Sequence, residues 1–271
     1  MQNSGQVWVI ELTSTEGTLQ FSTRTSRTIN DFSFSRTQPS ENQYDVAMID
    51  VTIAPELKAR CPAVALGCVA ARVETTVSPA ELDKLLGANE ERIAKLPEPR
   101  AVLENPAIRA TRAGYKALGK DPARYRGSAE ALLRRLISGK GMPRINNVVD
   151  VINLVSVESR LPIGLYDLAH VEGAIEFRAG RAGETYKGIG KYDLNLQDLP
   201  LFADGKGPHG SATSDSERTM VTEATRQVLA ILVSFGGAGS GSSGLEHWSQ
   251  HLSELLNQHA AASDVEQRIM T

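Results

Sequence analysis

The chain has 271 residues, of which 41% are hydrophobic and 23% charged, and its formal net charge is −3. This balance is typical of a globular protein with one large domain or two small ones. No apolar run reaches the roughly 18 to 20 residues that a membrane span needs, and the first five residues show no signal-peptide pattern.

The cysteine and histidine content predicts a soluble cytoplasmic protein without a metal or cofactor. Only two cysteines occur, Cys61 and Cys68, which is usual in a reducing compartment. We expect both to be small core residues rather than nucleophiles. The five histidines show no Cys/His pattern typical of a structural zinc site.

The first 44 residues are rich in Ser, Thr, Asn and Gln and predict an extension, flexible outside two short strands at 7–10 and 18–22. The main domain is expected over 45–235. It begins with buried strands at 46–53 and 64–71, which are separated by a short helical turn.

Three helix starts follow along the chain. Ser78 precedes Pro79 and stands three residues before Glu81, which predicts a capping box and a helix to about residue 96. Asn105 before Pro106 predicts a second capped helix. Ser128 is expected to cap a third, which carries a stripe of leucines.

The segment after Asn146 is rich in β-branched residues, but its apolar spacing favours a helix. Strands at 174–178 and 184–189 follow, then a helical turn at 222–225 and a buried strand at 228–234. A Gly/Ser linker at 236–244 leads to an amphipathic helix and tail at 245–271, which is expected to pack back on the domain.

Charge is unevenly distributed along the chain. Residues 109–144 hold ten basic residues and two acids, a local net charge of +8. Such a stretch indicates a contact with a polyanion, or alternatively the solvated faces of two helices with acids opposite them.

Two polar clusters lie within this framework, one over residues 143–167 and one over residues 210–223. In their order and spacing they resemble the editing (B3/B4-type) domain of the phenylalanyl-tRNA synthetase beta subunit. In that domain the two segments line the pocket that receives a misattached amino acid. The resemblance covers roughly residues 45–235. It implies an α/β fold with a mixed sheet flanked by helices.

The resemblance implies a free-standing trans-editing factor, an aminoacyl-tRNA deacylase that hydrolyses the ester of mischarged tRNA. Its partners would be the aminoacylated 3′ end of tRNA and possible synthetases or translation factors, and not a membrane. The sequence shows no aminoacylation domain and no Gly-x-x-x-x-Gly-Lys-Ser/Thr loop, so a ligase is not expected. The alternative is a non-catalytic module on the same fold that binds an amino acid or RNA.

The resemblance also nominates site residues. The candidate catalytic residues are Asn146, His209 and Glu217. The candidate substrate-binding residues are Asn147, Gly164, Ser211, Thr213, Asp215 and Arg218. The candidate tRNA-binding residues are Arg109, Arg112, Lys116, Arg134, Arg135 and Arg144. Since an aminoacyl ester is already activated, a positioned water and an oxyanion donor suffice, and no Gly-x-Ser-x-Gly elbow is present.

Structural roles remain open for several of these residues. Asn147 can cap the helix with Asn146 in a turn, and Asp150 is better explained as part of that cap. His209 can be an exposed loop residue, and Arg218 can form an internal salt bridge.

The family commonly has histidine at the position of Gly164. The glycine predicts a larger space, so the family's amino-acid specificity should not be transferred.

Overall fold

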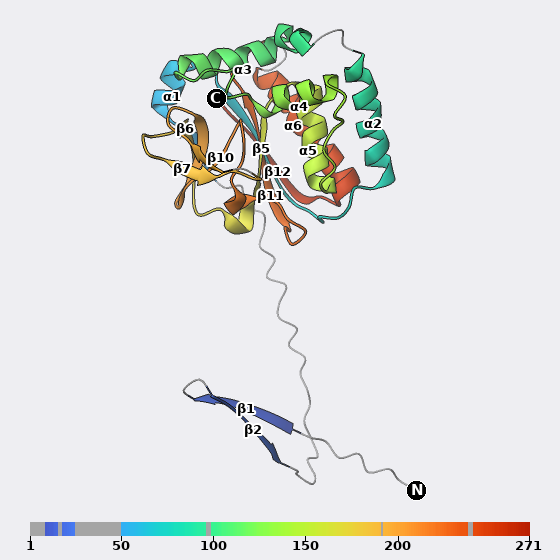
Figure 1. Cartoon of the computed structure of the whole chain (residues 1–271), viewed down its shortest axis with the longest axis vertical. Coiled ribbons are helices and arrows are strands. Elements are labelled where there is room, and N and C mark those ends of the chain that lie inside the picture. The colour runs from blue at the N-terminus through green and yellow to red at the C-terminus, as the bar shows by residue number, and fades with distance from the viewer. Residues whose placement is uncertain (1–8, 16–17, 25–49, 96–98, 191, 238–240) are drawn as a thin grey trace. The chain divides into compact units, whose positions relative to one another are not determined.

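The computed structural model describes residues 9–15, 18–24, 50–95, 99–190, 192–237 and 241–271 (Figure 1). The chain divides into two compact units, residues 1–43 and 44–271. In the first unit, β1 (Val9–Thr15) pairs antiparallel with β2 (Thr18–Arg24). Of the strand expected at 46–53, residues 46–49 lie outside the described residues, and β3 covers Val51–Ile53.

The second unit has two four-stranded sheets. The larger sheet, so called because its strands are longer, is antiparallel and has the strand order β12-β4-β11-β5. Its strands are β4 (Ala65–Arg72), β5 (Ile163–Asp167), β11 (Gln227–Ser234) and β12 (Ser263–Met270). The sequence predicts β4 and β11 through their long apolar runs. Strand β12 corrects the expectation of a tail after the last helix. It is polar because it lies at the edge of the sheet, where most of its side chains are exposed.

The smaller sheet is mixed and has the order β10-β9-β6-β3. Its strands are β3, β6 (Ile175–Ala179), β9 (Pro200–Asp204) and β10 (Gly207–Ser211). Strands β3 and β6 are parallel, and the other pairs are antiparallel. A separate hairpin joins β7 (Thr185–Lys187) to β8 (Asp193–Asn195).

Successive side chains of the central strands point to opposite faces of the larger sheet, and each face packs into a hydrophobic core of its own. One face of the larger sheet, with Val69, Val228 and Leu232, packs against α2 (Ala80–Ala94), α4 (Ser128–Ile137), α5 (Asn147–Ser159) and α6 (Ser242–Ala260). The other face, with Leu66 and Ile231, packs against the smaller sheet, α1 (Pro55–Arg60) and α3 (Pro106–Ala117). Figure 1 shows these two sides of the larger sheet. The α/β prediction is confirmed, with the strands divided between two sheets.

The structure confirms one of the predicted helix caps and contradicts another. Asn105 caps α3, because its side chain accepts from the amides of Ala107 and Ile108 at 3.0 and 3.3 Å. The capping box at Ser78 is wrong: α2 begins after Pro79 without a side-chain cap. The Ser78 hydroxyl instead donates to the buried Asp150 carboxylate at 2.7 Å, and this charged acceptor forms the stronger bond.

Two further expectations at helix ends are settled by packing. Ser128 is the first residue of α4, not its cap, and its hydroxyl accepts from the Ile163 amide. Helix α6 does pack back on the domain, with Leu245, Leu252 and Leu256 fully buried.

Both cysteines are free and buried, as expected, and burial raises the pKa of Cys68 to about 12. Within the described ranges, no helix has both the length and the apolarity needed to cross a bilayer.

The described residues also form three short 3-10 helices, which are η1 (Pro99–Glu104), η2 (Leu168–His170) and η3 (Glu217–Thr219). The expected strand at 184–189 is shorter in the structure and covers β7. The turn expected at 222–225 closes through a hydrogen bond from the Thr225 amide to the Thr222 carbonyl.

Candidate functional site

A buried tyrosine, Tyr166, lies at the centre of several predicted site residues. Gly164 and Tyr166 are two residues apart in β5 and so point to the same face, toward β10. A Cβ atom at Gly164 would lie 2.1 Å from the Tyr166 hydroxyl, and one at Gly210 would lie 2.3 Å from a ring carbon. The expectation of a larger space at Gly164 is therefore wrong, because the Tyr166 ring fills it.

His209 lies against this ring in β10. The two ring centroids are 4.5 Å apart in an edge-to-face arrangement, and His209 has no exposed surface. The alternative of an exposed loop histidine is therefore wrong. Neither ring nitrogen has a hydrogen-bond partner among the described residues. Burial lowers the pKa of His209 to about 4, so the imidazole is neutral at pH 7.

The 211–219 loop follows β10 and closes over the cluster. Asp215 accepts from the Leu165 amide at 3.3 Å, which ties the loop to β5. The Ser211 hydroxyl accepts from Tyr186, and Thr213 shares a 2.8 Å hydrogen bond with Tyr115. Of the nominated residues, His209 thus contacts the Tyr166 ring and Asp215 binds β5 beside Gly164, whereas Ser211 and Thr213 bind Tyr186 and Tyr115.

Tyr166 is electrostatically coupled to the loop. Burial raises the pKa of Tyr166 well above its ordinary value, and the nearby Asp215 carboxylate raises it further. The phenol therefore stays protonated at any physiological pH and can act as a donor toward that carboxylate.

Glu217 and Arg218 lie beside the cluster on η3 and are held by internal ion pairs. Glu217 pairs with Lys187 at 2.9 Å on a half-exposed surface. Arg218 forms two 2.9 Å bonds to the carboxylate of Asp204, whose side chain is fully buried. Its guanidinium also donates to the carbonyls of His170 and Gly207. The internal salt bridge is therefore the arrangement that the structure shows for Arg218.

The two asparagines lie elsewhere, at the start of α5. Asn146 is the N-cap residue, one position earlier than expected, and accepts from the Val149 amide at 2.9 Å. Asp150 accepts from Ser78 and from the Ile145 amide. Among the described residues, no hydrogen bond or ion pair joins Asn146 to His209 or Glu217.

Asn147 is almost completely buried and makes four hydrogen bonds. Its amide nitrogen donates to the carbonyls of Glu74 and His259 at 2.8 and 2.9 Å. Its oxygen accepts from the amides of Thr76 and Val148 at 2.8 and 3.0 Å. All four hydrogen-bonding positions of this amide are used, so Asn147 joins three segments of the fold.

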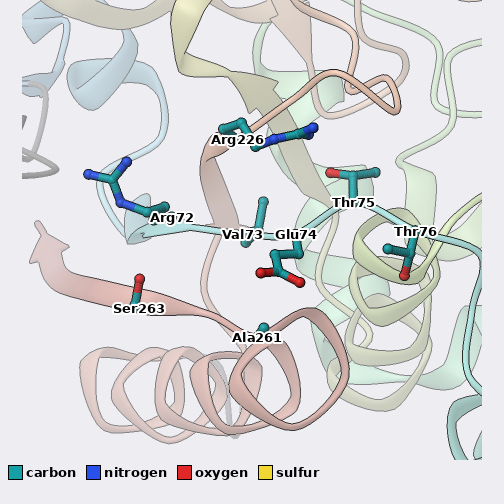
Figure 2. A pocket seen from close by; sticks show the side chains of 8 residues that line it. All are labelled: Arg72, Val73, Glu74, Thr75, Thr76, Arg226, Ala261 and Ser263. Atoms are coloured by element: carbon teal, nitrogen blue, oxygen red, sulfur yellow. The ribbon is translucent and has the colours of Figure 1, made fainter. Parts of the chain in front are cut away.

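An open pocket of about 460 Å³ lies beside the segment that Asn147 holds (Figure 2). In Figure 2 the guanidinium groups of Arg72 and Arg226 point away from each other. Arg72 pairs with Asp264 at 3.1 Å, and Arg226 donates to two carbonyls of the 223–225 turn. The sequence analysis missed this pocket because its lining residues come from three distant segments.

Acids neutralise much of the basic stretch. Arg112 and Arg134 both bind Glu130, which is 2% exposed, at 3.0 and 2.8 Å. Arg144 pairs with two acids of α2, and Arg135 donates to the Gly141 carbonyl. Arg109 and Lys116 are exposed on α3, and no ion pair joins them to a described acid.

The histidines of α6 form a pattern that the sequence analysis overlooked. His247 and His251 are four residues apart and their rings are stacked, with centroids 6.4 Å apart. His251 bonds to Glu158 at 3.0 Å. Across the described part of the chain, no three His, Cys, Asp or Glu side chains are grouped to hold a metal ion.

Comparison with known proteins relates part of the sequence to a family. Residues 110–243 match the B3/4 domain family. The chain is 31% identical over 100 residues to the phenylalanine–tRNA ligase beta subunit of Bartonella henselae, covering 36% of this chain and 12% of the relative. It is 30% identical over 105 residues to that of Paramagnetospirillum magneticum, covering 38% and 13%.

A solved N-terminal fragment of the phenylalanyl-tRNA synthetase beta subunit from Pyrococcus horikoshii aligns with a TM-score of 0.42 and 13% identity. The alignment covers 83% of this chain and 51% of that one. The matched family model makes residues 110–243 a B3/4-type domain. The chain therefore contains a B3/4-type domain and is similar to part of the phenylalanine–tRNA ligase beta subunit, and the matches span 12–13% of the two beta subunits compared.

The matched range separates the two polar regions. The cluster around Tyr166, from β5 to the 211–219 loop, lies entirely within residues 110–243. Apart from Arg226, the residues that line the 460 Å³ pocket lie outside that range. The Tyr166 cluster is therefore the candidate site that belongs to the family domain.

Proposed function

We propose that this protein is a free-standing trans-editing factor that hydrolyses the ester bond of mischarged aminoacyl-tRNA. The observation that carries the proposal is the convergence of Gly164, His209 and Asp215 around Tyr166, inside the range matched by the family. The relatives are tRNA ligase subunits by name, which supports tRNA as the macromolecule involved.

The chemistry available at this point suits an activated ester. A neutral imidazole whose nitrogens have no partner among the described residues can accept a hydrogen bond from a water molecule and orient it toward the ester. The Asp215 carboxylate can fix that water or the substrate ammonium. Because His209 is fully buried behind the Tyr166 ring, it acts on the ester through this water molecule and not by direct contact with the substrate.

The tRNA contact is proposed for exposed cations of α3 and α4. Arg109, Lys116 and Arg135 are exposed, whereas Arg112, Arg134 and Arg144 are engaged with acids. Phosphate contacts make binding strongly salt-dependent. Replacing Arg109 and Lys116 by Ala should weaken tRNA binding and reduce its dependence on salt concentration.

The test is deacylation of a panel of correctly and incorrectly charged tRNAs by the purified protein. Rapid release from one mischarged species is expected, with kcat reduced about 100-fold or more in His209→Ala. His170→Ala, which removes an exposed histidine side chain, serves as the matched control and should keep wild-type activity. Absence of release from every species in the panel would refute the proposal.

A second candidate, a non-catalytic module that binds an amino acid or RNA, is favoured by one observation. The Tyr166 ring fills the space at Gly164, so this space cannot receive a substrate side chain while the ring is in place. Binding of a free amino acid or of tRNA without any deacylation would select this alternative.

A further inference from the structure

The Tyr166 ring occupies a space that the backbone has cleared for it. Glycines on two different strands, Gly164 in β5 and Gly210 in β10, approach the ring more closely than any Cβ atom could. Phe202 adds an edge-to-face contact, with centroids 5.7 Å apart. The ring is therefore enclosed as an aromatic ligand would be, but it belongs to the chain itself.

The surroundings of the ring are more polar than an ordinary core. His209 presents two nitrogens for which the described part of the chain supplies no hydrogen-bond partner, and Asp215 lies beside the phenol. Native proteins rarely leave buried polar atoms unsatisfied, because each costs stability. Their presence indicates a place where a polar ligand group or water is bound during function.

We propose that Tyr166 occupies the side-chain part of the aminoacyl site and thereby restricts the reaction to small aminoacyl groups. This inference rests on the proposed function and names its substrate class. With the ring in place, an aromatic substrate side chain has no space between Gly164 and Gly210. A glycyl, alanyl or seryl group needs only the half-exposed rim at residues 213–215.

The first experiment measures the space itself, independently of catalysis. Tyr166→Ala should create a ring-sized hole, and engineered holes of about 150 Å³ bind benzene. We expect p-cresol, the tyrosine side chain without its backbone, to raise the Tm of Tyr166→Ala saturably. Wild type and Tyr166→Phe, which both keep the ring, should show no shift. Tyr166→Leu replaces the alanine variant if that variant fails to fold.

The second experiment connects the space to the substrate. L-Tyrosinamide, a stand-in for an esterified tyrosine, should bind Tyr166→Ala at least tenfold more tightly than wild type. L-Alaninamide should bind both proteins equally. In deacylation, the ratio of tyrosyl-tRNA to alanyl-tRNA cleavage should rise at least tenfold in the variant.

The outcomes separate this inference from the proposed function. If neither Tyr166→Ala nor Tyr166→Leu responds to p-cresol, or if wild type binds tyrosinamide as tightly as the variants, the inference is overturned. If the ligand preferences hold but no protein releases an amino acid from tRNA, the proposed deacylase activity fails. The role of Tyr166 in excluding rings would then apply to an amino-acid-binding site.

Discussion

Asn147 lies in the polar cluster over residues 143–167, and its replacement tests whether this residue has a structural role. Asn147→Ala would leave the buried His259 carbonyl without its partner, at about 2 kcal/mol. It would also remove the hydrogen-bond partner of the Glu74 carbonyl and of the Thr76 amide. Each of these losses should cost only about 1 kcal/mol, because water reaches both groups from the pocket. We therefore expect the free energy of unfolding to fall by about 4 kcal/mol.

The neighbouring residue provides a matched control. Asn146→Ala removes one capping bond to the Val149 amide and should cost about 1 kcal/mol. Urea unfolding followed by circular dichroism measures both variants, and unchanged m-values would show that the comparison is valid. A loss for Asn147→Ala within 1 kcal/mol of that for Asn146→Ala would show that the four hydrogen bonds do not hold the fold together as described.

Three more predictions concern buried charge and a buried histidine. Glu130→Ala leaves Arg112 without its buried acidic partner and should lower the free energy of unfolding by about 3 kcal/mol in a urea titration. Arg218→Ala removes the charged partner of the buried Asp204 carboxylate, which keeps only the Glu172 and Lys206 amides, and should cost about 3 kcal/mol, measured in the same way. A change below 1 kcal/mol in either would contradict the burial described. His209 should titrate near pH 4 by NMR, and stability should fall as pH drops from about 6.5 to about 4, because the unfolded chain binds the proton first. His209→Phe should flatten that part of the pH profile, and an unchanged profile would contradict this assignment.

Local patterns predicted those features whose causes are local. Asn105 caps α3 because its acceptor lies within three residues of the amides that it satisfies. The leucine stripe of α6 predicts its buried face, since helical spacing alone puts Leu245, Leu252 and Leu256 on one side.

Features set by distant partners could not be predicted in this way. Ser78 has every local mark of a cap, yet its hydroxyl binds Asp150, 72 residues away. The filling of the space at Gly164 depends on β10 lying opposite β5, which puts Gly210 on the other side of the same ring. Strand alternation shows that Gly164 and Tyr166 share a face, but not which strand lies across from them.

The nominated residues differ most clearly in how many of their hydrogen-bonding positions are already used within the fold, and less clearly in chemical type. Asn147 uses all its bonding positions on backbone groups, and Arg218 uses its guanidinium on Asp204 and two carbonyls. Such side chains hold the fold and have little capacity left for a substrate. His209 is the opposite case, since it is buried, neutral and without a partner for either nitrogen among the described residues. Maintaining it in that state costs stability, and a cost of this kind persists where function requires it. The chemistry of this domain is therefore best sought at His209, behind the Tyr166 ring.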